Sequence, residues 1–350
     1  MQHKAARAYA SVKYEGVNIT KDITEDLISM NYTDNLDSAD ELELNIKDIN
    51  RKWLKEWHPR KGDKIDVTII GEHWDNFGDL KTYPCGSFQV DAITYSGPPS
   101  VISIKAISVD IKANYKDEKR NKSWENVTLK DIVSEITSKA NKSLIYEVEN
   151  IIKYKRVDQS LESDLQLLKR LCEQEGLSLK SAVDKLIVFN KEKYEKEDVL
   201  GVIELTPYLN FTIDSDDADT YDSCIIEYYD PTLKETLRGE FKAPEREGYK
   251  ENTNRVLRVK ENNSVPGESK EEKEAFLTKK AKSKLRSKNS NETKVNISNR
   301  KGDFITWAGS TVTLVNFGVY SGKYVVNKIT RTIGDSGYKQ SLELNKTLEY

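Results

Sequence analysis

The chain has 350 residues, of which 37% are hydrophobic and 32% are charged. This length suits two or three domains, and 18 Tyr, 8 Phe and 5 Trp supply large apolar side chains for folded cores. The formal net charge is −3, from 55 basic and 58 acidic residues. This near balance argues against a dedicated nucleic-acid-binding protein, which would carry a basic excess.

Targeting signals and cysteines indicate where such a protein is made. No run approaches 18 apolar residues, so we expect no transmembrane helix. The N-terminus, Met1–Lys4, lacks an apolar leader, so we expect no secretory signal peptide. The three cysteines, Cys85, Cys172 and Cys224, are odd in number and far apart, which favours reduced thiols. The sequence therefore predicts a protein made in the cytosol, without direct membrane insertion.

Residues 1–112 are predicted to be mostly β-structure. Polar and apolar residues alternate strictly over 41–47, which places Leu42, Leu44 and Ile46 on one face of a strand. Further strands are predicted at 27–32, 64–70, 86–93 and 101–107. Short strands separated by turn residues predict a small antiparallel barrel or sandwich.

Residues 113–200 change to a mixed α+β pattern. Apolar residues at helical spacing predict helices at 127–136 and 160–172. Thr128 followed by Asp131 is compatible with a capping box at the start of the first helix. The buried face of the second helix is expected to carry Leu161, Leu165, Leu168, Leu171 and Cys172, and Gly176 to end that helix. Two strands are expected after each helix, at 143–148 and 152–157 and then at 177–179 and 186–189.

Residues 201–350 return to β-structure with one long helix at 270–288. Strands are predicted at 224–229, 256–259, 292–298, 311–315, 323–332 and 341–345, and the polar stretch 244–270 is expected to be largely a loop. The helix begins with acidic residues and ends with the basic stretch Lys279–Lys288. This order suits the helix macrodipole without a nucleic-acid partner, although a surface facing a neighbouring subunit is also compatible with it.

Short motifs occur in a fixed order along nearly the whole chain. They are 36–48 (LDSADELELNIKD), Trp57 with Pro59 and 61–63 (KGD), 86–91 and 96–99 (SGPP), 123–129, 162–165 with Gly176, 307–309 (WAG), and 318–324 with 337–338. In this order they resemble the late control protein D family, the baseplate hub of contractile phage tails. The resemblance looks closest to hubs of Gram-positive phages and of tail-derived bacteriocins.

The resemblance implies an α+β, mainly β protein of three parts. Residues 1–112 and 201–350 would be tube-like antiparallel β-barrel domains, the second with one long helix, and 113–200 a small α+β insert. It further implies a structural, non-enzymatic homotrimer in the baseplate of a phage or tail-like particle. Such a hub joins the hexameric tail-tube protein to the trimeric central spike and contacts other baseplate and tape-measure proteins. The alternative is a tail-tip peptidoglycan hydrolase, since two distant carboxylates could meet in the fold.

Two acidic clusters are candidate cation sites. The first comprises Asp34, Asp37, Asp40 and Glu41, and the second comprises Asp214, Asp216, Asp217, Asp219 and Asp222. Neither has the spacing of a calcium-binding loop. A solvated loop is the favoured interpretation of the first cluster, and a solvated or interface loop is favoured over a calcium site for the second.

The remaining candidates for chemistry lack the surrounding residues that each chemistry requires. The histidines, His3, His58 and His73, lie in no zinc-binding motif. Residues 318–324 resemble a phosphate loop only superficially, because the glycine spacing is wrong and a strand is expected to follow. Cys172 lies on an apolar helix face, and no Gly-x-Ser-x-Gly elbow is present. The sequence therefore predicts no catalytic, cofactor-binding or metal-binding residue and no cofactor.

Overall fold

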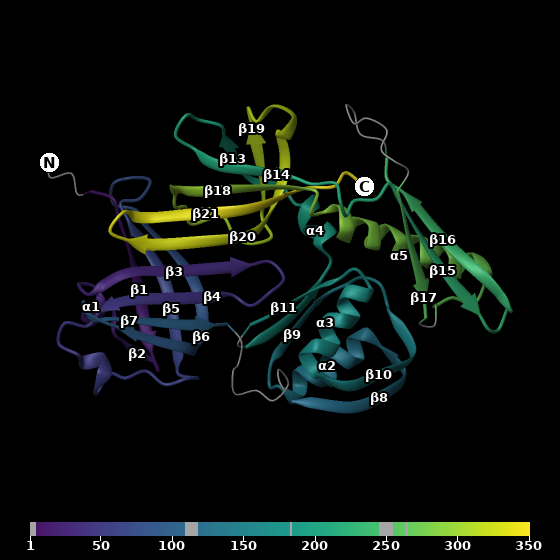
Figure 1. The fold of residues 1–350 in the computed structure, drawn as a ribbon, viewed down its shortest axis with the longest axis horizontal. Coiled ribbons are helices and arrows are strands. Elements are labelled where there is room, and N and C mark those ends of the chain that lie inside the picture. The colour runs from purple at the N-terminus through teal and green to yellow at the C-terminus, as the bar shows by residue number, and fades with distance from the viewer. Residues whose placement is uncertain (1–4, 109–117, 183, 245–254, 263–264) are drawn as a thin grey trace.

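In the computed structural model, which describes residues 5–108, 118–182, 184–244, 255–262 and 265–350, the protein is α+β and mainly β, as predicted. Its largest unit is a 13-stranded sheet built from both ends of the chain (Figure 1). The N-terminal strands are β1 Arg7–Tyr14, β2 Val17–Asn18, β3 Leu27–Asn35, β4 Glu41–Lys47, β5 Lys64–Glu72, β6 Leu80–Ser96 and β7 Val101–Ile107. The C-terminal strands are β13 Val199–Glu204, β14 Asn210–Ser215, β18 Thr293–Lys301, β19 Thr311–Val315, β20 Gly322–Gly334 and β21 Gly337–Lys346.

The prediction of two separate β-barrels is corrected by the strand pairing. The first part of β20 pairs with β19, and its second part, from Lys328 to Gly334, pairs with β3. A strand of 13 residues is long enough to join both ends of the chain in one sheet. Strand β1 lies beside β20 and β21, yet no ladder joins them within the described ranges. The sheet is therefore rolled, but among the described residues no hydrogen-bond ladder closes it into a barrel.

Two hydrophobic cores lie within the rolled sheet. Leu42, Leu44 and Ile46 are buried in the first core, as the alternation in β4 predicted. The second core lies among the C-terminal strands and includes Val295 and Leu344. Alternating apolar residues on neighbouring strands thus form two interiors against one continuous sheet.

The insert between the two ends of the sheet is a compact α+β unit. Its elements are β8 Lys119–Thr128, α2 Leu129–Lys139, β9 Ser143–Glu147, β10 Lys153–Ser163, α3 Asp164–Gln174, β11 Ser178–Ser181 and β12 Lys185–Phe189. The predicted capping box is present, because the Asp131 N–H donates to Thr128 Oγ1 at 3.1 Å. The two predicted strand pairs are not equivalent: β11 and β12 form a hairpin, whereas β9 pairs parallel with β12 and β10 pairs with β8.

The second insert helix begins later than the spacing of its leucines predicted. Ser163 is the N-cap of the helix and its side chain accepts the N–H of Gln166, whereas residues 160–163 belong to β10. Leu161 therefore lies outside the helix, with a positive φ of 50° and a side chain that is 70% exposed. Leu167 takes its place on the buried face, beside Leu168, Leu171 and Cys172.

A third unit lies outside the large sheet, at the right of Figure 1. It comprises β15 Ser223–Asp230, β16 Glu235–Lys242, β17 Val256–Glu261 and α5 Lys270–Asn289. The apolar side of α5, with Leu277, Ala281 and Leu285, packs on this three-stranded sheet. Part of the predicted loop 244–270, namely 245–254 and 263–264, falls outside the described residues. The short elements are α1 Thr20–Ile23, α4 Lys191–Lys196, η1 Lys52–Leu54 and η2 Gly318–Tyr320.

Candidate functional site

The first acidic cluster lies at a junction between the large sheet and the insert. Lys180, on β11, places Nζ 2.8 Å from Asp34 Oδ1 and 2.9 Å from Asp40 Oδ1. Both carboxylates are buried, with Asp34 only 5% and Asp40 only 9% exposed. Buried charges need a partner of opposite sign. The cation held by these two carboxylates is therefore a lysine of the same chain.

Both carboxylates of this triad also accept hydrogen bonds from backbone amides. Asp34 Oδ2 accepts the N–H of Ala308, at 2.9 Å, and Asp40 Oδ1 accepts that of Asn35, at 3.1 Å. Burial and the neighbouring Asp34 carboxylate raise the pKa of Asp40 to about 6, against the pull of Lys180. Burial favours the neutral form of Lys180, but the two carboxylates outweigh it and raise the pKa of the lysine. One cation thus stabilises two acids and joins three segments of the chain.

The prediction of a solvated loop holds for only half of this cluster. Asp37 and Glu41 are exposed, and Asp37 pairs with Lys191 at 2.6 Å. Asp34 and Asp40 are buried, because the fold brings Lys180 to them from the insert. No local pattern in the sequence indicates that pairing.

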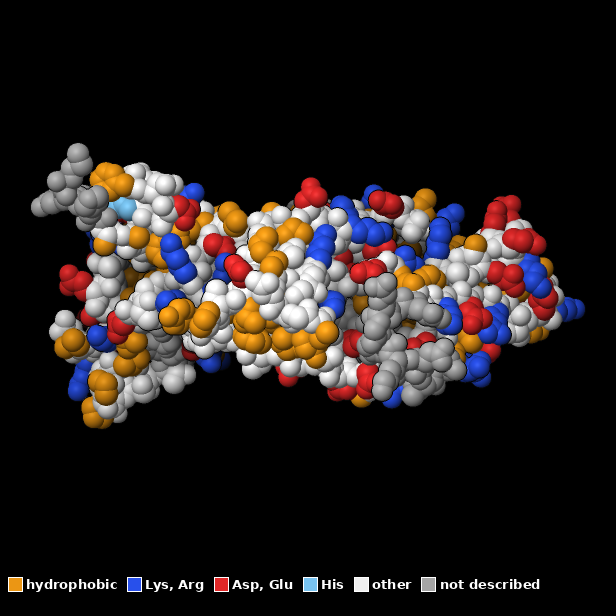
Figure 2. Space-filling model, turned by 90° about the horizontal axis from the view of Figure 1, so that it is seen from above, with side chains coloured by type: hydrophobic (Ala, Val, Ile, Leu, Met, Phe, Trp, Pro, Cys, Tyr) orange, Lys and Arg blue, Asp and Glu red, His pale blue; other side chains and the backbone are white. Residues whose placement is uncertain are grey.

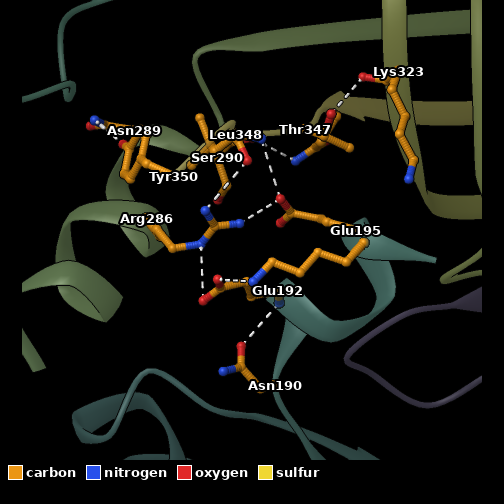
Figure 3. Close-up of polar contacts among 12 residues, drawn as sticks. Asn190, Glu192, Glu195, Arg286, Asn289, Ser290, Lys323, Thr347, Leu348 and Tyr350 are labelled. Atoms are coloured by element: carbon orange, nitrogen blue, oxygen red, sulfur yellow. Dashed lines mark hydrogen bonds and ion pairs between the residues drawn. The ribbon is translucent and has the colours of Figure 1, made fainter. Parts of the chain in front are cut away.

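A second junction joins α4, α5 and the C-terminal segment (Figure 3). Arg286, near the end of α5, donates from Nη2 to Glu195 Oε2 at 2.6 Å, and Glu192 lies 3.9 Å from its Nε. The Leu348 N–H donates to the same Glu195 oxygen at 3.2 Å. Lys282 pairs with Glu192 at 3.3 Å. These contacts fix the C-terminal segment and the end of the insert to the same helix.

The basic face of α5 also contacts the insert directly. The buried Lys280 places Nζ 3.0 Å from Glu175 and 2.7 Å from Glu261. Burial opposes the charge of Lys280, but these two glutamates prevail and raise the pKa of the lysine. Lys284 donates to the Glu173 carbonyl at 2.7 Å. At these positions the basic stretch predicted at 279–288 therefore binds carboxylates and a backbone carbonyl of the same chain.

The second acidic cluster lies in and after β14, and most of it is exposed. Asp222 is half-buried and accepts the Arg255 N–H at 2.8 Å, and Asp216 accepts the Ala218 N–H at 2.9 Å. Within the described ranges, no three His, Cys, Asp or Glu side chains are placed to hold a metal ion. The same stretch borders exposed apolar side chains of β13 and β14, which gather near the middle of the face in Figure 2.

The histidine and glycine candidates lie in turns. His58 Nδ1 is 3.2 Å from the Trp53 carbonyl, and His73 Nδ1 accepts the Gly78 N–H at 2.8 Å. His3 falls outside the described residues. Residues 318–324 form η2 and the start of β20, so a strand follows these glycines, as predicted.

The three cysteines are buried. Burial raises the pKa of Cys85 and of Cys172 to about 12, and that of Cys224 to about 11. The reactive thiolate is therefore scarce at neutral pH. In the part of the chain that the structure describes, no helix is both long and apolar enough to span a bilayer.

No known protein-family profile matches the sequence. Over 173 residues the chain is 30% identical to the "Probable baseplate hub protein" of Escherichia phage 186 and 31% identical to that of Escherichia phage P2. Each match covers 49% of this chain and 42% of the relative, so it spans less than half the length of these curated proteins. Both relatives come from Escherichia phages, and the closer resemblance to Gram-positive hubs stays a prediction.

Solved structures with the same fold cover nearly the whole chain. The 43 kDa tail protein of prophage MuSo2 from Shewanella oneidensis has a TM-score of 0.68 at 14% identity, covering 97% of this chain and 98% of that one. The tail protein from Neisseria meningitidis MC58 has a TM-score of 0.66 at 14% identity, covering 97% of both chains. The E. coli c3393 protein has a TM-score of 0.52 at 9% identity, covering 97% of this chain and 77% of that one. It is described as a type VI secretion component similar in structure to the T4 tail proteins gp27 and gp5.

At such identities the structural likeness shows a shared fold alone. The sequence likeness is independent of it and covers half of the chain. The protein is thus similar in sequence to phage baseplate hub proteins over half its length, and it has the fold of phage tail proteins over nearly all of it.

Proposed function

We propose that the protein is the structural hub of a contractile baseplate, in a phage or a tail-like particle. The observation that carries the proposal is the 30% identity to a baseplate hub protein over 173 residues. The fold shared with tail proteins over 97% of the chain supports it independently. In this role the chain forms a homotrimer that joins the hexameric tail tube to the trimeric central spike, beside other baseplate and tape-measure proteins.

The use of charged groups within the fold supports an assembly role. Lys180, Lys280 and Arg286 each pair with carboxylates that come from another part of the chain. Buried pairs of this kind hold parts in one fixed geometry, because separating them would leave an uncompensated buried charge. A hub that passes force between tube and spike needs such a fixed arrangement.

We further propose three functional parts, with 1–112 and 201–350 as tube-like domains and 113–200 as the insert. The large sheet, which draws strands from both ends of the chain, supports tube-like roles for these ends. The helix α5 and its small sheet belong to the second part by sequence and form a separate unit beside the large sheet.

The decisive experiment places the chain in its particle. Particles that carry a tagged copy of this protein are imaged by electron cryomicroscopy, with threefold averaging of the baseplate. We expect three copies of the fold at the junction of tube and spike. Density for this fold elsewhere in the particle, or its absence from purified particles, would refute the hub function. Clearing of cell walls by the purified chain in a zymogram would instead favour a peptidoglycan hydrolase.

A further inference from the structure

Strands β13 and β14 leave part of the large sheet without a partner. Strand β13 pairs only with β19 and β14 only with β18, among the described strands, so each has one open edge. Only residues 205–209 separate the two strands. Open strand edges present unpaired N–H and C=O groups that readily pair with another chain. We call residues 197–219 the β13–β14 surface.

Apolar side chains are exposed on the β13–β14 surface. Tyr208 is 93% exposed and Val202 is 64% exposed, and Leu200 and Phe211 are also exposed. Figure 2 shows apolar side chains gathered near the middle of this face. Contiguous exposed apolar area of this kind marks an interaction surface.

The charge of the β13–β14 surface restricts its partner. It contains seven acidic residues and no lysine or arginine. All seven acidic side chains are exposed, and no ion pair engages them within the described ranges. The seven are Glu197, Asp198, Glu204, Asp214, Asp216, Asp217 and Asp219. A partner must therefore combine apolar side chains with positive charge.

The same chain carries a surface of that composition. Residues 47–64, which include the connection from β4 to β5, contain seven basic and three acidic residues, and one of the acids, Asp48, is buried. Ile49 is 78% exposed and Leu54 is 49% exposed. Within the described ranges, five exposed bases of this stretch form no ion pair: Lys47, Arg51, Lys55, Arg60 and Lys61. We call it the β4–β5 surface.

The two surfaces lie on different sides of the molecule. In Figure 1, β13 and β14 lie at the top, whereas β4 and β5 lie at the lower left. The β4–β5 surface adjoins the turn between β1 and β2, because the Glu15 N–H donates to the Lys64 carbonyl at 2.9 Å. Strand β2 is the other end of the large sheet, and among the described strands it pairs only with β1, which leaves it an open edge of its own.

We propose that the β13–β14 surface of one copy docks on the β4–β5 surface of a second copy. Both surfaces expose apolar side chains and their charges are opposite, so the two are complementary. A contact between two different surfaces is head-to-tail, and it closes into a ring where the rotation permits. The proposal deepens the hub function and rests on it for the number of copies in the ring.

The test reverses charge on each surface of the full chain. Asp198, Asp217 and Asp219 are changed to Lys in one variant, and Lys47, Lys55 and Lys61 are changed to Glu in another. Their side chains make no hydrogen bond or ion pair among the described residues, so both variants should fold. A third variant carries all six changes, and Lys153→Glu with Lys155→Glu, exposed positions on the insert, is the matched control.

Sedimentation velocity measures self-association at low and high salt. The wild-type chain is expected to associate, and more weakly as ionic strength rises. Each single-surface variant should associate roughly tenfold or more weakly, because like charges then face each other. The variant with all six changes should regain wild-type association, since the charges of the two surfaces are again opposite. The control should match the wild type. Circular dichroism checks that every variant is folded.

Two outcomes overturn the proposal: a wild-type chain that stays monomeric at low salt, or a folded variant with all six changes that stays dissociated. The particle imaging described above is independent of both. If imaging places the chain at the hub but the variant with all six changes does not associate, only the docking proposal is refuted. If that variant does associate but imaging places the chain elsewhere in the particle, only the hub function is refuted.

Discussion

Lys180 Nζ lies 2.8 Å from Asp34 Oδ1, although 146 positions separate the two residues. Lys180 belongs to the insert and Asp34 to β3 of the large sheet. Asp40 lies 2.9 Å from the same nitrogen, so one lysine compensates two buried carboxylates. This triad is the point at which the position of the insert can be tested most directly.

Lys180→Met is expected to destabilise the protein strongly. The change leaves Asp34 and Asp40 buried with no cation between them, and the loss of one partner from a buried pair costs about 3–5 kcal/mol. Urea unfolding followed by tryptophan fluorescence measures the change. Lys191→Met is the matched control, because its pair with Asp37 is exposed and should contribute less than about 1 kcal/mol. Equal losses in the two variants would contradict the triad.

Asp40→Asn should change how stability depends on pH. Burial and Asp34 raise the pKa of Asp40 from 3.8 to about 6 in the folded protein. A raised pKa means that the folded state binds the proton more tightly, so stability is present at low pH and is lost as pH rises. Between about pH 4 and 6 the wild type should lose on the order of 2 kcal/mol relative to Asp40→Asn.

Urea titrations of both proteins across this pH range provide the measurement. The retained Lys180–Asp34 pair should keep the variant folded at neutral pH. A difference in unfolding free energy that does not vary with pH would show that Asp40 titrates normally.

Leu168→Asp should prevent the insert from folding. Leu168 is fully buried on α3, and an unpaired carboxylate at that position should cost more than about 4 kcal/mol. Soluble expression and the thermal melting temperature are the measurements. Leu161→Asp is the matched control, since Leu161 is 70% exposed and the change should be tolerated. If Leu161→Asp were the damaging change, α3 would begin earlier than Asp164.

The difference between these two leucines shows what the local sequence pattern can and cannot predict. Helical spacing alone favours Leu161 as a core residue, because Leu161, Leu165 and Leu168 recur at helical intervals. The cap at Ser163 overrides that spacing. Its side chain accepts the N–H of Gln166, so the helix begins at Asp164 and Leu161 stays in the preceding strand. In contrast, the cap at Thr128 and the alternation in 41–47 agree with their surroundings, and both predictions are confirmed.

Features that depend on distant partners could not be predicted in this way. The pairing of β20 with β3 joins residues about 300 positions apart, and it turns two expected barrels into one rolled sheet. Asp34 is likewise 146 positions from Lys180, and Glu175 is 105 positions from Lys280. Charge pattern indicated that α5 needs no nucleic acid, but it could not indicate which carboxylates its lysines bind.

The cysteines should be unreactive in the folded protein. Burial raises the pKa of all three thiols, with Cys85 and Cys172 at about 12, so little thiolate forms at neutral pH. Titration with a thiol reagent should find almost no fast-reacting group in native protein and three groups after unfolding in guanidinium. Rapid labelling of one cysteine in native protein would show that its core opens locally.

Gly239→Ala tests how closely α5 approaches its sheet. Gly239 lies on β16, and a Cβ atom at this position would overlap the backbone of Leu277 on α5. The helix or the strand would have to move, and overpacking of this kind costs roughly 1–3 kcal/mol. Gly201→Ala is the matched control, because no atom lies within 4 Å of a Cβ built on Gly201 of β13. Thermal unfolding of both variants gives the comparison. Equal melting temperatures would mean that the helix and the sheet are not in direct backbone contact, and that the apolar side of α5 packs more loosely on β15 and β16 than its buried leucines imply.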